Sequence, residues 1–245
     1  MVTSERMRLS FVNRFREATG ALAEFVYPPS CSTCWRNLGR GENYICHHCW
    51  DGFERVVPTE TMVQTIEAKF LADSSVDRIE SVFLFEQDPR VRLAIHLLKY
   101  AGAERIAERL GIFIAKKIAS DSNLSTGSLI VPVPLHRARQ RERGYNQSEL
   151  IAKTISNELQ IRCVPHLLRR TRQTQTQTMF DAEGRARNIA GAFSSEVGFE
   201  SELGEKCILL IDDVITTGST IKECAKVLKE NGAAKVFAAS AAITI

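Results

Sequence analysis

Short apolar runs alternate with longer segments of helical periodicity through most of the chain after residue 80. The runs are typical of buried strands, and apolar residues three or four positions apart mark the helices between them. Strands that alternate with helices of this length form a parallel sheet with helices on its faces, so the pattern predicts an α/β fold. The predicted strands are 81–85, 128–133, 207–211 and 235–245, and the predicted helices begin at Asp88–Pro89 and span 104–118, 149–159 and 221–231.

The chain before residue 80 follows a different pattern. A short amphipathic helix is expected over residues 8–26, and Pro28-Pro29 would end it, because proline has no backbone N–H to continue the helix. A turn-rich segment with two pairs of cysteines follows, with a short strand ending at Ile45, and then a polar connection. We therefore predict two domains: the N-terminal helix and cysteine-rich module over 1–60, and the α/β domain over 61–245.

Composition narrows the class of protein. The chain has 245 residues, 44% of them hydrophobic and 25% charged, which is typical of a globular protein. No apolar stretch approaches the roughly 20 residues that a membrane span needs, and the arginine-containing N-terminus lacks the apolar block of a signal peptide. The expected location is therefore the cytoplasm. The net charge of +3 is too small to indicate nucleic-acid binding on its own.

Four of the seven cysteines form two CxxC pairs, C-S-T-C and C-H-H-C, separated by eleven residues. This spacing can bring four thiolates to the corners of a tetrahedron around zinc, and it predicts a zinc ribbon with a structural ion. The alternative is two redox pairs or unliganded thiols, and the odd number of cysteines argues against a disulfide framework. The predicted ligands are Cys31, Cys34, Cys46 and Cys49, with His47 and His48 exposed between them and Cys163, Cys207 and Cys224 buried as small hydrophobic residues.

The segment 207–220, C-I-L-L-I-D-D-V-I-T-T-G-S-T, combines three features. An apolar strand delivers Asp212 and Asp213 to its carboxyl end, where open α/β sheets bind ligands. A hydroxyl-rich turn with a glycine then leads into a helix, whose first N–H groups can bind a phosphate. No lysine follows the glycine, so this is not a Walker loop. Acids beside a phosphate site suit a sugar phosphate, because the acids accept hydrogen bonds from sugar hydroxyls; ribose 5-phosphate fits this description.

This segment resembles the phosphoribosyl pyrophosphate (PRPP) signature of type I phosphoribosyltransferases. Together with the cysteine pairs, it makes the chain resemble the ComF/GntX family of phosphoribosyltransferase-like proteins. Three further segments agree with that family: H-L-L-K-Y-A-G over 96–102, V-P-V-P-L-H-R-A-R-Q-R-E-R-G-Y-N-Q over 131–147, and the segment 169–193. Gly184 departs from the family's pattern, in which a glutamate precedes the arginine.

The resemblance implies a type I phosphoribosyltransferase fold preceded by a small zinc-ribbon domain, and a site for PRPP with Mg²⁺. Asp212 and Asp213 would bind the ribose hydroxyls, directly or through Mg²⁺, and Thr216, Thr217, Gly218, Ser219 and Thr220 the 5-phosphate. The implied pyrophosphate-loop residues are Pro134, Leu135, Arg143, Asn146 and Gln147, and the implied flexible-loop residues are Gln177, Arg185 and Asn188. Lys99 is a candidate pocket residue, although a surface lysine is the simpler interpretation.

Positive charge concentrates between Val131 and Ala190, where eleven Lys or Arg face five Asp or Glu. A pyrophosphate site alone would explain these cations. A single strand of DNA along this face, with bases stacked on Tyr145 or Phe180, would explain them too. The resemblance implies a role in DNA uptake, with phosphoribosyl transfer to an unknown acceptor. The alternative is a non-catalytic module that senses PRPP or a nucleotide and binds single-stranded DNA or a competence helicase through its ribbon and basic face.

Overall fold

The computed structural model describes residues 28–57, 59–71, 74–101, 104–125, 127–172, 189–196 and 203–245. The chain separates into two compact units, one ending at Gly52 and the other beginning at Phe53. The helix expected over residues 8–26 lies outside the described residues. None of the described helices is long and apolar enough to cross a membrane.

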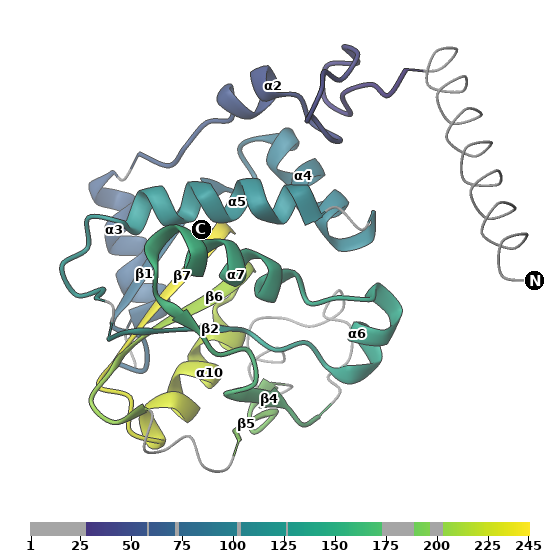
Figure 1. Ribbon diagram of the computed structural model, residues 1–245. Coiled ribbons are helices and arrows are strands. Elements are labelled where there is room, and N and C mark those ends of the chain that lie inside the picture. The colour runs from purple at the N-terminus through teal and green to yellow at the C-terminus, as the bar shows by residue number, and fades with distance from the viewer. Residues whose placement is uncertain are drawn as a thin grey trace, which may run out of the picture. The chain divides into compact units, whose positions relative to one another are not determined.

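The larger unit is built on a five-stranded parallel sheet (Figure 1). Its strand order is β1 (Arg78–Leu84), β7 (Lys235–Ile243), β6 (Cys207–Ile215), β2 (Leu129–Pro132) and β3 (Arg162–Cys163). The central strands β6 and β7 are apolar along nearly their whole length because helices cover both faces of the sheet. A separate antiparallel pair joins β4 (Leu168–Arg170) to β5 (Phe193–Ser195).

Helices flank this sheet on both sides. Helices α5 (Glu104–Ile118) and α7 (Gln147–Leu159) lie side by side on one face, and α10 (Ser219–Glu230) lies on the other (Figure 1). Gly111 allows the close approach of α5 to α7, because a Cβ at this position would lie 2.6 Å from the Cβ of Thr154. The remaining described helices are α2 (His47–Asp51), α3 (Glu60–Ile66), the π-helical turn η1 (Glu67–Leu71), α4 (Pro89–Tyr100) and α6 (Arg137–Arg143).

The predicted α/β class is confirmed, with a parallel sheet, flanking helices and a cysteine cluster ahead of them. This arrangement is consistent with the type I phosphoribosyltransferase fold. Asp88 caps α4 as expected: its side chain accepts a hydrogen bond from the N–H of Arg90. Two local predictions were wrong. The segment before Ile45 forms an isolated bridge rather than a strand, since Tyr44 has a positive φ of 58°, and Cys163 and Cys207 are half-buried, whereas Cys224 is buried.

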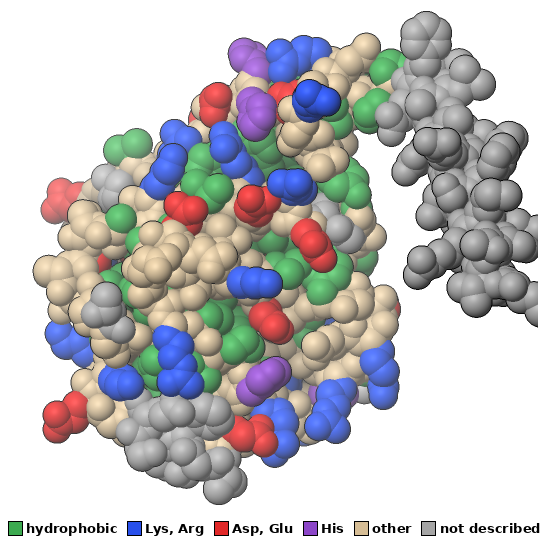
Figure 2. All heavy atoms as spheres, in the orientation of Figure 1, with side chains coloured by type: hydrophobic (Ala, Val, Ile, Leu, Met, Phe, Trp, Pro, Cys, Tyr) green, Lys and Arg blue, Asp and Glu red, His purple; other side chains and the backbone are tan. Residues whose placement is uncertain are grey.

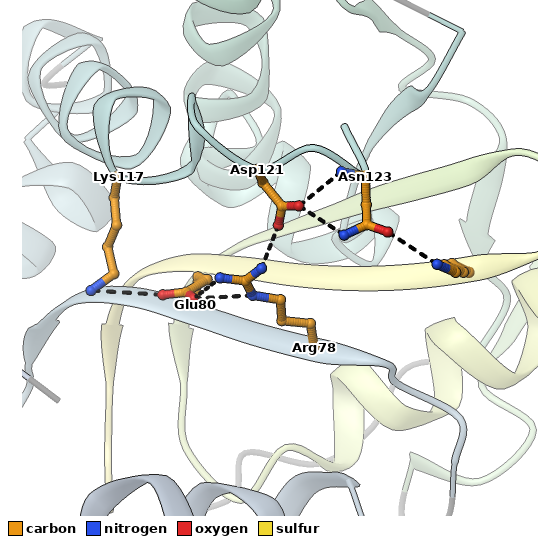
Figure 3. Close-up of polar contacts among 6 residues, drawn as sticks. Arg78, Glu80, Lys117, Asp121 and Asn123 are labelled. Atoms are coloured by element: carbon orange, nitrogen blue, oxygen red, sulfur yellow. Dashed lines mark hydrogen bonds and ion pairs between the residues drawn. The ribbon is translucent and has the colours of Figure 1, made fainter. Parts of the chain in front are cut away.

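A polar network joins the amino ends of strands β1 and β7 to the end of α5 (Figure 3). The guanidinium of Arg78 donates to Asp121 at 2.7 Å and to Glu80 at 2.8 Å, and Lys117 pairs with Glu80 at 3.7 Å. Asn123 donates to Asp121 through its backbone and its side chain. Burial alone would raise the pKa of Asp121, but the hydrogen bonds from Asn123 and the charge of Arg78 outweigh burial, so the pKa is lowered. This carboxylate therefore stabilises the fold above about pH 4 and loses that effect in acid.

Replacing Asp121 tests the strength of this network. The side chain of Asp121 is only 7% exposed, so Asp121→Ala leaves the Nη1 of Arg78 and both donors of Asn123 without this acceptor, while Arg78 keeps its ion pair with Glu80. We expect the free energy of unfolding at neutral pH to fall by about 1–3 kcal/mol. Thermal denaturation followed by circular dichroism measures the change. Glu108→Ala is the matched control, because its ion pair with Arg105 is exposed and should contribute little; equal losses in the two variants would contradict this account.

Candidate functional site

The cysteine cluster of the smaller unit has the geometry of a tetrahedral metal site. The ligand atoms of Cys31, Cys34, Cys46 and Cys49 all lie within 4.8 Å of one another. The Sγ atoms of Cys31 and Cys49 are 3.8 Å apart, and those of Cys34 and Cys46 are 3.7 Å apart. A tetrahedron with zinc–sulfur bonds of about 2.3 Å has edges of about 3.8 Å. The four predicted ligands are thus compatible with a structural zinc ion.

Backbone N–H groups support the sulfur of Cys31. The N–H groups of Thr33 and Cys46 each donate to its Sγ at 3.4 Å. Burial would raise the pKa of Cys31, but the backbone hydrogen bonds, led by that of Cys46, outweigh burial and lower the pKa to about 6. His47 and His48 are exposed on the short helix α2 between the second pair of thiols. The structure therefore agrees with the prediction that the histidines stay outside the sulfur shell.

Strand β6 carries the two adjacent carboxylates, Asp212 and Asp213. The strand is longer than predicted and runs through both acids to Ile215, with Ile208–Ile211 fully buried before them. Asp213 is 9% exposed. The hydroxyl of Ser148, in the first turn of α7, donates to the carboxylate of Asp212 at 3.0 Å. The acids therefore sit at the carboxyl edge of the sheet, facing the start of a helix from the neighbouring βα connection.

A lysine reaches this pair of acids from α4. The Nζ of Lys99 lies 2.8 Å from a carboxylate oxygen of Asp213, and the lysine side chain is half-buried. The simpler interpretation of Lys99 as a surface lysine was wrong. Only the fold brings residue 99 next to residue 213, so sequence periodicity on α4 could not distinguish this side chain from a solvent-facing one.

Burial and mutual repulsion make the two acids a strained pair. Burial is the largest effect on Asp212, and the negative charge of Asp213 adds to it; together they raise the pKa of Asp212 to about 7. The hydrogen bonds from Ser148 and from the N–H of Asp213 and the charge of Lys99 act in the opposite direction without compensating fully. A cation or hydroxyl donors at this position would relieve the repulsion.

The hydroxyl-rich turn 216–220 links β6 to α10. Gly218 precedes the first residue of α10 with a positive φ of 75°, and a Cβ there would collide with the ring of Phe70 in η1. The glycine therefore permits close packing of Phe70 as well as the turn. The hydroxyls of Thr217 and Ser219 lie 3.0 Å apart, within hydrogen-bonding distance. The N–H of Ser219, the first residue of α10, donates to the hydroxyl of Thr217 at 3.5 Å, and the glycine cap offers no side chain to the N–H groups that follow in this twelve-residue helix, where an anion could bind.

One cavity of about 280 Å³ unites these parts. It is lined by both acids, Thr216 and Thr220, together with Ser148 and Phe85. Four cationic side chains face it, against the two acids. These are Lys99, Arg139, Arg143 and Arg170. Burial, followed by the charge of Arg139, lowers the pKa of Arg170, which shows that positive charge is crowded at this wall.

The predicted pyrophosphate-loop residues divide between two roles. Pro134, Leu135, Arg143 and Gln147 line the cavity. Gln147 is 2% exposed, and its Nε2 has no hydrogen-bond partner among the described residues. Asn146 lies instead on a neighbouring cavity; it caps α7 by accepting from the N–H of Ser148, and it donates to the carbonyl of Val133. The loop thus presents side chains to the cavity, and Asn146 holds the loop in place.

Sequence reasoning missed some residues of the cavity, and some of the residues that it predicted lie outside the described part of the chain. Helix α6 was not predicted, and with it the direction of Arg139 into the cavity was missed. The signal that could have suggested this helix is the run of strong helix formers R-A-R-Q-R-E-R, with Gly144 at its end. Arg170, at the end of β4, was also missed as a pocket residue. Phe180 and the flexible-loop candidates Gln177, Arg185 and Asn188 lie outside the described residues.

Replacing Asp212 by asparagine tests the strain in the acid pair. The native pKa of Asp212 lies above its ordinary value of 3.8, so the wild-type protein takes up a proton when it folds between about pH 4 and pH 7. Its free energy of unfolding therefore falls as the pH rises through this window. Asp212→Asn removes the charge and keeps an oxygen that accepts from Ser148. We expect the variant to melt a few degrees above the wild type at pH 8 and at the same temperature near pH 4.

The control for this measurement is Glu158→Gln, an exposed position on α7. Its melting temperature should follow the wild type at both values of pH. A variant Asp212→Asn that melts below the wild type at pH 8 would show that the carboxylate stabilises the free protein, contrary to this account.

Comparison with known proteins finds relatives of this chain. DNA utilization protein YhgH of Escherichia coli O157:H7 is 34% identical over 151 residues, which cover 60% of this chain and 65% of the relative. Competence protein F of Haemophilus influenzae is 35% identical over 133 residues, which cover 54% of this chain and 58% of the relative. The matches thus span less than two thirds of either relative. YhgH of Salmonella typhi is 33% identical over 159 residues and is covered to 68% of its length.

No family model matches the chain. Among solved structures, that of TT1426 from Thermus thermophilus aligns with a TM-score of 0.34 and 11% identity, over 56% of this chain and 81% of that one, which is too weak a likeness to bear on the fold. The relatives are sufficient for a family assignment: at 33% identity over more than two thirds of a relative, this chain belongs to the ComF family, with competence protein F and DNA utilization protein YhgH.

Proposed function

We propose that the larger unit binds the ribose 5-phosphate part of PRPP in the cavity at the carboxyl edge of its sheet. Asp212 and Asp213 would accept hydrogen bonds from the ribose hydroxyls, and the turn 216–220 would bind the 5-phosphate. One observation supports this proposal above all: a single cavity is lined both by the two acids on β6 and by Thr216 and Thr220 on the turn that follows this strand.

The charges of the cavity support this assignment. A ligand with two sugar hydroxyls between two phosphate-bearing groups satisfies the acids and the arginines together, whereas the acids would repel a ligand that presented only phosphates to them. The crowded cations Arg139, Arg143 and Arg170 suit the pyrophosphate group. The Nε2 of Gln147, which has no partner among the described residues, supplies a neutral donor at the same wall.

The acid pair also fits a magnesium ion bound together with PRPP. Magnesium is held in proteins by one or two carboxylates together with water and phosphate oxygens. Asp212 and Asp213 would hold the ion, which supplies positive charge to the departing pyrophosphate. The chain's own contribution would be orientation: Lys99 and Ser148 hold the two carboxylates in position, and the turn 216–220 holds the phosphate end of the sugar.

The names of the relatives support a role that involves DNA. We infer a role in the uptake or use of DNA from competence protein F and DNA utilization protein YhgH. In one form of the proposal, the protein transfers the phosphoribosyl group to an acceptor. In the second form, it binds PRPP or a nucleotide without turnover and engages single-stranded DNA or a helicase. Arg137 and Arg141 favour the second form, because both are exposed on α6. Lys and Arg side chains also gather on the lower right of the face drawn in Figure 2, where Figure 1 places α6.

We further propose that the cysteine cluster holds a structural zinc ion. A shell of four thiolates leaves no position for water, so this ion would organise the smaller unit rather than take part in a reaction.

Binding of PRPP can be measured by thermal shift. With magnesium present, PRPP at about 100 times its Kd should stabilise the wild type by about 2.7 kcal/mol. The double variant Asp212→Ala plus Asp213→Ala should show no shift, because it loses the acceptors for the ribose hydroxyls and the ligands for magnesium. Glu158→Gln should shift like the wild type. A full shift in the double variant would place the ligand elsewhere.

Pyrophosphate release from PRPP, assayed with bases and with oligonucleotides, separates the two forms of the proposal. Release that depends on Asp212 and Asp213 supports transfer. A thermal shift without release supports the sensing form.

Metal content tests the zinc proposal. The purified wild type should contain about one zinc per chain by mass spectrometry. Cys31→Ser plus Cys34→Ser should lose the metal, because two of the four thiolates are gone. Cys163→Ser is the matched control, since it removes a thiol from the larger unit. A wild type without zinc, or a double variant that keeps it, would contradict the assignment.

A further inference from the structure

We propose that Tyr100 and His96, on the last turns of α4, form a stacking platform for a nucleobase at the edge of the sugar-phosphate cavity. The proposal rests on the proposed function, since it extends the ligand of that cavity from a ribose phosphate to a nucleotide. The juxtaposition that carries it is an exposed pair of aromatic rings beside two residues of the cavity, Lys99 and Arg143.

The exposure of Tyr100 is the first observation. The residue is 63% exposed, although its ring would gain from burial, and the ring of His96 lies 4.9 Å away with a tilt of 42°. His96 is exposed as well. One turn of helix therefore offers two neighbouring aromatic surfaces to the solvent, on the same side of α4.

The platform adjoins the cavity through both of its neighbours. Lys99 precedes Tyr100 in the chain and pairs with Asp213 inside the cavity. The guanidinium of Arg143 lies 5.3 Å from the centroid of the Tyr100 ring, and the same group donates to the Oε1 of Gln147 at 3.2 Å. A continuous series of contacts thus runs from the buried amide of Gln147, through Arg143, to the exposed ring of Tyr100.

The platform is also held in place. The hydroxyl of Tyr145 donates to the carbonyl of Leu98, which ties the end of α4 to the connection between α6 and α7. This contact gives Tyr145 a structural role. The ring of Tyr100 at the edge of the cavity is more exposed than that of Phe85 in the cavity wall, and so it is open to a ligand. A preorganised ring loses little entropy when a base stacks on it.

The chemistry of the surroundings favours a nucleobase over an apolar ligand. Every base has a π-face that stacks on tyrosine, whatever the sequence. Arginine beside the ring supplies both a cation–π partner and a phosphate contact. An apolar partner would gain nothing from Arg143 and would have to desolvate it.

The experiment compares Tyr100→Leu with Tyr100→Phe, which keeps the ring. Two probes carry bases, thymidine monophosphate and single-stranded oligothymidylate, and an abasic strand of equal length carries phosphates alone. Titration calorimetry and fluorescence anisotropy measure the affinities. We expect Tyr100→Leu to weaken a base-bearing probe roughly tenfold, Tyr100→Phe to retain wild-type affinity, and neither variant to change binding of the abasic strand. The probe that responds identifies the source of the base, a free nucleotide or a strand.

Three results would contradict the proposed platform. The first is an equal affinity of Tyr100→Leu and Tyr100→Phe for the base-bearing probes, and the second is an equal loss of affinity for base-bearing and abasic strands. The third is that the wild type binds neither base-bearing probe. Trp35→Leu, which removes a tryptophan that is 78% exposed, serves as control in the smaller unit, and a loss there instead would place the base site on that unit. The thermal shift with PRPP and magnesium should persist in Tyr100→Leu. If it is absent from the wild type, the proposed function fails; if it persists while the base affinities stay equal, only the platform fails.

Discussion

The confinement of two neighbouring carboxylates at the end of a buried strand is the constraint on which the larger unit depends. Four apolar residues of β6, Ile208–Ile211, are anchored between β7 and β2, and the strand continues directly into Asp212 and Asp213. Neither acid can turn away without moving the central strand of the sheet. Lys99 of α4 forms an ion pair with Asp213, and Ser148 of α7 donates a hydrogen bond to Asp212. Both helices therefore contact the same edge of the sheet.

The two edges of the sheet use charge in opposite ways. At the amino edge, Arg78, Asp121 and Asn123 satisfy one another, and the pKa of the acid is lowered. At the carboxyl edge, the pKa of Asp212 is raised and arginines crowd together. Groups satisfied within the protein stabilise it, whereas groups left under strain are typical of sites that await a ligand. The contrast supports the carboxyl edge as the functional one.

Much of this structure is predictable from the sequence because the informative signals are local. The apolar strands, the Asp88 cap and the spacing of the CxxC pairs each depend on a few neighbouring residues, and the α/β class and the cysteine cluster follow from them. The turn 216–220 was selected in the same way, and its binding of a phosphate stays a prediction. Lys99, Arg139 and Arg170 could not be identified with comparable certainty, because their roles depend on contacts with residues far away in the chain. Asn146 shows the converse: a residue within the correct motif serves as a helix cap.

The most direct measurement of the central claim is a crystal structure with ribose 5-phosphate and manganese, whose anomalous signal locates the ion. The account predicts the sugar hydroxyls and the metal at Asp212 and Asp213, with the phosphate against Thr216–Thr220. A sugar phosphate bound at another surface, or a metal found away from the two acids, would contradict it.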